Sequence, residues 1–147
     1  MARKSLETSV GDFTQSIGLL VRRARAAAPD GLSLTESTVM ARLAREGPAT
    51  TAGLARAESM KPQSMGATVA SLEEMGMVER QPHPTDGRQV NIHLTAKGAA
   101  VRKSAKDAKR TWLARAIGQL DDEERETLFA AGKIVLRMLE KADGGGL

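Results

Sequence analysis

Residues 61–95 combine a helix pattern and a hairpin pattern with no linker between them. Pro62 suits the first helical position, because its φ is fixed and its missing N–H is not needed there. Gly76 predicts a left-handed stop for the same helix. Apolar residues between them recur at helical spacing and predict one buried stripe: Met65, Val69 and Leu72. The chain must therefore adopt a fold in which a helix runs directly into a ribbon.

The opposite face of this predicted helix carries short side chains where a solvated helix usually carries Lys and Glu. They are Gln63, Ser64, Ala67, Thr68 and Ser71, with Lys61 just before the helix. Such a face can approach another surface closely and offers hydrogen-bond donors and acceptors, as a helix that reads the DNA major groove must. On its own, however, this pattern favours an ordinary exposed helix.

The ribbon pattern ends in a predicted turn. Residues 90–94 alternate apolar and polar side chains with a period of two, as a half-buried strand does. Asp86-Gly87 predicts the turn, and Pro82 and Pro84 predict a tip that is extended rather than paired. Arg88 is then expected at the end of a protruding hairpin, with Asp86 placed to hold or orient it. An arginine in a turn is usually just solvated, but here it follows a candidate reading helix and suits the narrow minor groove.

The stretch LEEMGMVERQPHPTDGRQVNIHLTAKG resembles the signature of the MarR family of winged-helix transcriptional regulators. In that signature a Leu-Glu-x-x-Gly helix end leads to a strand with Arg, a wing with Asp-x-Arg, and a Leu-Thr-x-x-Gly that opens the next helix. The matching residues are Leu72, Glu73, Gly76, Arg80, Asp86, Arg88, Leu94, Thr95 and Gly98. No single piece is specific, but the whole series in this order is.

The resemblance implies a mainly α fold with a small β-hairpin, in which a winged helix-turn-helix core is flanked by N- and C-terminal dimerisation helices. It implies a repressor that binds double-stranded DNA as a homodimer on a pseudo-palindromic operator, with reading helices about 34–36 Å apart. It also implies release by a small aromatic or phenolic effector, which would favour a wider spacing. The chain has no Tyr, two Phe and one Trp, so an aromatic-lined pocket is poorly supported and the effector stays open.

The organisation expected from these patterns is one intertwined domain. Residues 1–30 hold an N-terminal dimerisation helix, and residues 31–98 hold the winged helix-turn-helix core. Residues 99–147 hold a long linking helix and a C-terminal dimerisation helix. The last helix is apolar on two sides near the chain end, which one chain of this size cannot easily bury. A second copy is therefore expected to cover it.

The helix-turn-helix is predicted from its start and stop signals. Ser33 and Glu36 form a capping-box pattern that opens a helix ending at Gly47. Thr50 or Thr51 then caps a short helix before the tight turn into the reading helix. The residues expected to face inward are Val39, Met40 and Leu43 on the first of these helices and Leu54 and Ala55 on the second.

The predicted DNA contacts depart from the family in one respect. Many relatives carry a basic residue on the groove face of the reading helix, whereas this chain has only Lys61 at its start. Base readout would then depend on short polar groups, in part through water, with Arg80 and Arg88 supplying charge and Lys97 close to phosphate. The full predicted set is Lys61, Gln63, Ser64, Thr68, Ser71, Arg80, Asp86, Arg88 and Lys97.

Composition narrows the other classes of function. The chain has no cysteine and a formal net charge of +4, so thiol redox sensing is excluded and an anionic partner is favoured. We find no nucleophile with its base and no metal-ligand spacing, so we expect no enzyme activity, no cofactor and no bound metal. No apolar run is long enough to span a membrane, and we expect a cytoplasmic protein with no membrane partner. A non-specific architectural DNA-binding protein and a helical interaction scaffold remain as alternatives.

Overall fold

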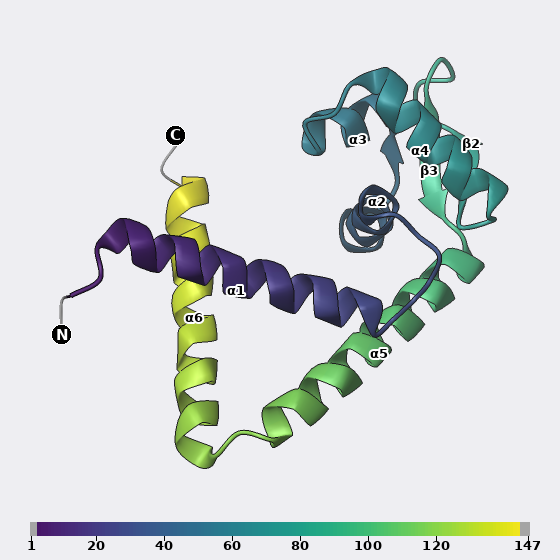
Figure 1. Cartoon of the computed structure of the whole chain (residues 1–147). Coiled ribbons are helices and arrows are strands. Elements are labelled where there is room, and N and C mark those ends of the chain that lie inside the picture. The colour runs from purple at the N-terminus through teal and green to yellow at the C-terminus, as the bar shows by residue number, and fades with distance from the viewer. Residues whose placement is uncertain (1–2, 145–147) are drawn as a thin grey trace. The chain divides into compact units, whose positions relative to one another are not determined.

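The computed structural model describes residues 3–144, and most of them are helical (Figure 1). In chain order the elements are α1 (Leu6–Ala26), α2 (Leu34–Glu46), β1 (Ala49–Thr50), α3 (Thr51–Ala57), α4 (Pro62–Glu74), β2 (Val78–Pro82), β3 (Val90–Leu94), α5 (Ala96–Gly118) and α6 (Asp122–Gly144). The chain divides into two compact units, Met1–Lys109 and Arg110–Leu147. The predicted fold class, mainly α with a small β element, is confirmed.

The sheet has three antiparallel strands in the order β1-β3-β2, where the sequence predicted only a two-stranded ribbon. Gly47 takes a φ of 87°, and this left-handed turn directs the chain after α2 back along β3. Ala49 then pairs with Ile92, while Arg80 of β2 pairs with Ile92 from the other side. A strand of two residues shows no period-two pattern, which is why the sequence did not reveal it.

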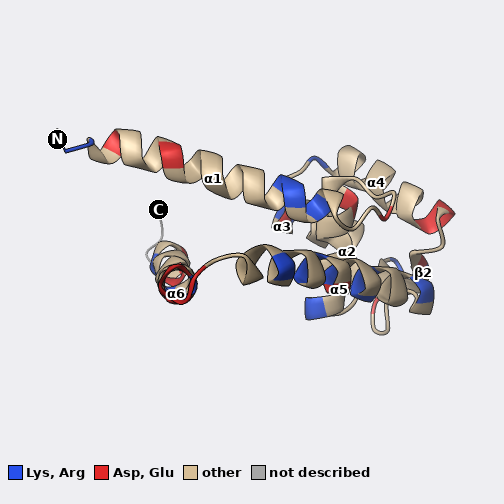
Figure 2. Cartoon of the chain, turned by 60° about the horizontal axis from the view of Figure 1, so that its bottom comes forward, with Lys and Arg blue, Asp and Glu red and all other residues tan. Residues whose placement is uncertain are grey.

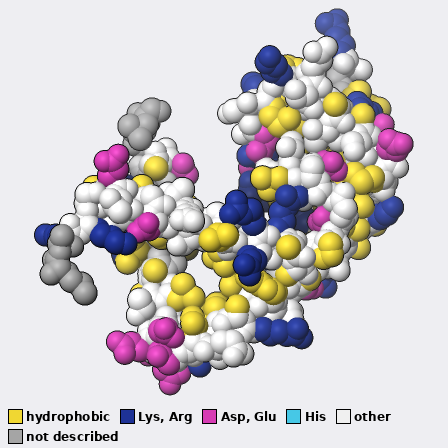
Figure 3. All heavy atoms as spheres, in the orientation of Figure 1, with side chains coloured by type: hydrophobic (Ala, Val, Ile, Leu, Met, Phe, Trp, Pro, Cys, Tyr) yellow, Lys and Arg dark blue, Asp and Glu magenta, His cyan; other side chains and the backbone are white. Residues whose placement is uncertain are grey.

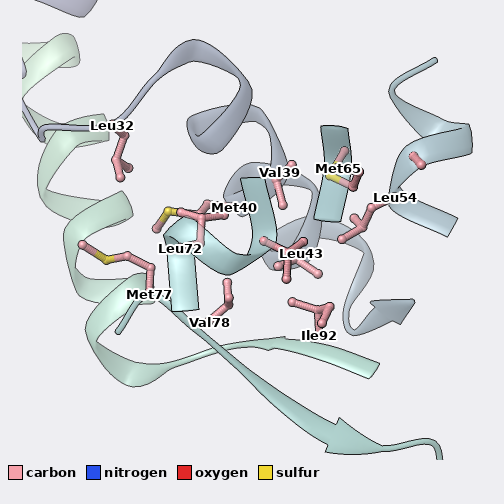
Figure 4. Packing of buried hydrophobic residues seen from close by; sticks show 12 residues of the cluster. Leu32, Val39, Met40, Leu43, Leu54, Met65, Leu72, Met77, Val78 and Ile92 are labelled. Carbon is pink, nitrogen blue, oxygen red and sulfur yellow. The ribbon is translucent and has the colours of Figure 1, made fainter. Parts of the chain in front are cut away.

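The hydrophobic core lies in the first unit, where α2, α3 and α4 pack against the sheet (Figure 4). Its fully buried side chains come from all of these elements, and they include every residue that was predicted to face inward. The core consists of Leu32, Val39, Met40, Leu43, Leu54, Ala55, Met65, Val69, Leu72, Met77, Val78 and Ile92. The core thus holds the reading helix and the base of the wing in one packed body.

The helix starts follow the predicted caps. Ser33 Oγ accepts from Glu36 N at 3.1 Å, and Thr50, rather than Thr51, caps α3 by accepting from Gly53 N at 3.0 Å. Only half of the capping box at Ser33 forms, because no bond returns from the Glu36 carboxylate. Its Oε2 is buried without a hydrogen-bond partner.

Neither α1 nor α6 has a buried residue in the described chain. The side chain of Phe13 on α1 is 48% exposed and that of Leu136 on α6 is 63% exposed. Both terminal helices thus carry exposed apolar side chains, as the sequence predicted for the last helix. Among residues 3–144, no helix is both long enough and apolar enough to cross a bilayer.

Candidate nucleic-acid interface

The exposed face of α4 carries the predicted reading residues. Gln63 and Ser64 are exposed and Thr68 and Ser71 are half-buried, while the opposite stripe of α4 lies in the core. Thr68 Oγ1 donates to the Ser64 carbonyl at 3.1 Å. Because that bond uses the hydroxyl proton, Thr68 offers only acceptor lone pairs outward, which suits the amino groups of adenine or cytosine.

Lys61 precedes the first turn of α4 in an extended conformation and makes no side-chain capping bond. Within the described residues its ammonium has no hydrogen-bond or ion-pair partner, and the side chain is exposed. Its charge therefore stands unneutralised at the N-terminal end of the reading helix.

The tip of the wing, residues 83–89, is a hydrogen-bonded turn centred on Asp86. Gln89 N donates to the Asp86 carbonyl at 3.0 Å, and Arg88 N donates to Asp86 Oδ1, also at 3.0 Å. Asp86 thus holds the backbone of Arg88, which is how an Asp at the first position of a turn commonly acts. The guanidinium of Arg88 makes no hydrogen bond or ion pair to any described residue. It projects from a fixed backbone.

His83 is a second organiser of the tip, a role that the sequence patterns did not indicate. Its Nδ1 accepts from Asp86 N at 3.2 Å and from Thr85 N at 3.3 Å. This geometry requires the tautomer that carries its proton on Nε2. His83 N also donates to the Gln89 carbonyl at 3.0 Å, so pairing extends beyond Pro82 and the tip is less open than predicted.

Two of the predicted cations already have partners within the chain. Arg80 Nε lies 3.1 Å from Glu73 Oε2 and so ties β2 to the end of α4, in a pair that is 42% and 43% exposed. Lys97 Nζ donates to the Met75 carbonyl at 2.8 Å. Glu73 offsets part of the Arg80 charge, whereas the Met75 carbonyl is neutral and leaves the charge of Lys97 in place. Both side chains retain further N–H donors.

Lys97 belongs to a set of contacts that we call the α4–α5 clamp, formed by Thr95, Lys97 and Gly98 against residues 75–77. Thr95 Oγ1 donates to the Gly76 carbonyl at 2.6 Å and accepts from Gly98 N at 3.0 Å. Gly98 is buried against the Met77 carbonyl, and a Cβ at this position would overlap that oxygen. The first turn of α5 is thereby fixed to the turn that follows the reading helix.

The turn between α3 and α4 is held from α2. Arg42 Nε lies 2.7 Å from Glu58 Oε1, and Arg42 Nη1 lies 2.9 Å from Glu46 Oε1. Hydrogen bonds to Glu58 and Glu46 raise the pKa of Arg42, and the bond from Arg42 lowers the pKa of the Glu46 carboxyl. Next to Glu58, Ser59 adopts a φ of 52°, the left-handed region that favours glycine.

Arg56 is a cation near this surface that the sequence patterns did not single out. It lines a groove of about 420 Å³ between α3 and the wing, together with Gln89 at the end of the tip and Val90 at the start of β3. In the sequence, Arg56 is simply an arginine four residues after Ala52 in the predicted short helix. That pattern is too common to indicate a role in binding.

A short helix, a tight turn, a second helix with an exposed polar face and an adjoining hairpin together define a winged helix-turn-helix protein. Residues 32–90 match the MarR family. The chain is 34% identical to an uncharacterised HTH-type transcriptional regulator of Mycobacterium leprae, over 89% of this chain and 92% of the relative. It is 31% identical to an HTH-type transcriptional repressor of Mycobacterium tuberculosis, over 92% of this chain and 94% of that protein. The chain belongs to the MarR family of DNA-binding transcriptional regulators.

Solved structures have the same fold. A putative transcriptional regulator of Pseudomonas aeruginosa superposes with a TM-score of 0.80 at 25% identity, covering 93% of this chain and 98% of that one. Wild-type MarR of Escherichia coli, in its apo form, superposes with a TM-score of 0.68 at 23% identity, covering 92% of this chain and 99% of its own.

Proposed function

We propose that this protein is a sequence-specific repressor that binds a pseudo-palindromic operator in double-stranded DNA as a homodimer. The observation that carries the proposal is the rigid placement of the wing beside the reading helix. The Arg80–Glu73 pair and the α4–α5 clamp both join the end of α4 to the elements that follow it. Helix and wing can therefore approach the duplex as a single preorganised surface.

The proposed contacts divide by groove. The short polar side chains of α4, which are Gln63, Ser64, Thr68 and Ser71, face the major groove. Arg88, on its fixed turn, enters the adjacent minor groove, where the negative potential is strongest. Lys61, Arg80 and Lys97 lie near phosphates, the last two through the N–H groups that their partners leave unused.

The homodimer is proposed from the exposed apolar faces of α1 and α6. The exposed large side chains on these helices are 40% to 81% exposed in the described chain. They include Val10, Phe13, Ile17, Leu20, Leu128, Phe129, Leu136 and Leu139. Figure 3 shows hydrophobic side chains in the open along α6. Apolar faces of this extent mark an interaction surface, and a second copy supplies a matching one. Residues 1–30 and 99–147 would then be the dimerisation segments of one intertwined domain.

A small-molecule effector is the remaining part of the proposal. A cavity of about 400 Å³ lies within the first unit, between the segment that follows α1 and the first half of α5. It is lined by Ala27, Ala28, Pro29, Asp30, Val101, Ser104, Ala105 and Ala108. Its volume is in the range of ligand pockets, and an aromatic or phenolic molecule of modest size would fit. A ligand that favours a wider spacing of the reading helices by a few kcal/mol would empty the operator.

The test is selection of source-genome fragments by the purified protein at about physiological salt, where non-specific binding has weakened. The proposal expects recovery of an inverted repeat with half-sites one helical turn apart. Fragments retained without a shared sequence would show a non-specific architectural protein. This is the second candidate, because the middle of the α4 polar face has no basic residue. No retention at all would point to an interaction scaffold.

A further inference from the structure

The groove beside Arg56 lies outside the set of contacts predicted from the sequence. Its lining combines polar and apolar surface and comes from both ends of α3 and from the wing. The lining residues are Thr50, Thr51, Ala52, Arg56, Gln89 and Val90. Gln89 follows Arg88 directly, so one wall of the groove is continuous with the wing tip that is proposed to enter the minor groove.

The side chain of Arg56 lies along this groove. Its Nη2 atom is 3.9 Å from the position that a Cβ on Gly53 would occupy, so the guanidinium lies back along α3 over a residue with no side chain. Among residues 3–144 the guanidinium has no hydrogen-bond or ion-pair partner. The amide of Gln89 uses one N–H on Asp86 Oδ2, at 3.3 Å, and keeps the other.

We propose that this groove binds a backbone phosphate of the DNA strand that passes between α3 and the wing. Arg56 supplies the charge, and the Thr51 hydroxyl and the remaining Gln89 N–H supply further donors, a set that suits phosphate oxygens. The proposal rests on the proposed DNA-binding function and adds a cation to it. That cation matters because Arg80 is already paired with Glu73 and Lys97 already donates one hydrogen bond to the Met75 carbonyl.

The distribution of charge supports this site. Lys and Arg side chains stand over both the wing tip and the region of α3, at the same end of the first unit (Figure 3). Lys and Arg residues also run along α5, as Figure 2 shows. One of them, Lys103, provides a matched control, because it is exposed on α5 and does not line the groove.

The experiment measures affinity for the selected operator and for a scrambled duplex over a range of salt concentrations. Arg56→Ala should weaken binding to both duplexes by a similar factor, roughly tenfold near physiological salt. It should also reduce the slope of log K against log salt by about 0.9, the loss of one phosphate contact. Arg56→Lys should keep the slope, and Lys103→Ala should leave both quantities unchanged.

A second variant tests the same site without removing a side chain. Ala52→Glu places an acid in the first turn of α3, where it favours the helix, so the protein should melt no lower than the wild type. Repulsion of phosphate from the groove should nevertheless weaken binding to both duplexes.

An unchanged salt slope for Arg56→Ala, or a loss of affinity confined to the operator, would overturn the phosphate site. The proposed function would still stand in that case if the wild-type protein bound its operator. If the wild-type protein selects no operator, it is the proposed function that fails.

Discussion

The ammonium of Lys97 donates a hydrogen bond to the backbone carbonyl of Met75, with 2.8 Å between Nζ and O. The bond joins the first turn of α5 to the residue that caps the reading helix α4. Together with Thr95 and Gly98 it makes the end of α4 and the start of α5 a single body. A displacement of the first turn of α5 would therefore carry the reading helix with it, so a change along α5 could reach the proposed DNA-binding surface.

The close approach inside this clamp should make Gly98 sensitive to substitution. Gly98→Ala would push a Cβ into the Met77 carbonyl, and backbone cannot easily yield. We expect the free energy of unfolding to fall by about 1–3 kcal/mol, measured by urea denaturation at a fixed protomer concentration. Gly66→Ala is the control, because a Cβ there meets open space within α4. It should raise stability by about 0.5–1 kcal/mol, and equal effects of the two changes would contradict the clamp.

Arg88 should matter for binding and not for folding. We expect Arg88→Ala to weaken operator binding by roughly 1–3 kcal/mol, since the guanidinium is proposed to lie in the minor groove. The melting temperature and the oligomeric state should not change, because no described residue depends on this side chain. Fluorescence anisotropy and analytical ultracentrifugation would measure the two effects, and unchanged affinity would refute the assignment of the wing.

Ser59 occupies a backbone conformation that costs a residue with a side chain some free energy. Its φ of 52° places it in the left-handed region, in the turn between α3 and α4. We expect Ser59→Gly to raise the free energy of unfolding by about 0.5–1 kcal/mol, and Ser59→Val to lower it by more than that. Thermal melts of the two variants beside the wild type would measure this, and a more stable Val variant would contradict it.

The pair of Arg42 and Glu46 should make stability depend on acid pH. The Arg42 guanidinium lowers the pKa of the Glu46 carboxyl in the folded chain. A lowered folded-state pKa gives stability that is present above the unfolded pKa, about 4.3, and is lost as the pH falls through the folded value. The stability difference between wild type and Glu46→Gln should thus be largest above about pH 5 and shrink below about pH 4. A difference that stays constant across this range would disprove the linkage.

The exposed apolar face of α6 should be needed for self-association. Leu136, whose side chain is 63% exposed, is expected to be covered by the second copy. Leu136→Glu should shift the protein toward monomers in sedimentation experiments and lower operator affinity in parallel, because a buried unpaired carboxylate is costly. Gln119→Glu adds the same charge next to the end of α5 and should leave the dimer intact. A dimer that survives Leu136→Glu unchanged would place the interface elsewhere.

Much of the fold was predictable because its signals act between residues close in sequence. Ser33 caps α2 by accepting from Glu36 N, three residues further along the chain. Gly76 ends α4 with a φ of 75°, and Asp86 closes its turn within residues 86–89. The apolar spacing on α4 likewise placed its three buried residues correctly. The family signature added the wing and the reading helix. The predicted DNA contacts remain predictions that the binding experiments above will test.

Tertiary structure decided what no local pattern contains. The strand β1 exists only because β3 offers an edge to Ala49 and Thr50. Arg80 pairs with Glu73, 7 residues earlier in the chain, and Lys97 donates to the Met75 carbonyl, 22 residues earlier. Arg56 shares a groove with Gln89 only because α3 packs beside the wing. The sequence by itself thus determined the helices, the hairpin and the family. Packing determined β1 and which side chains are already engaged within the chain, because such contacts depend on distances between elements and not on spacing along the chain.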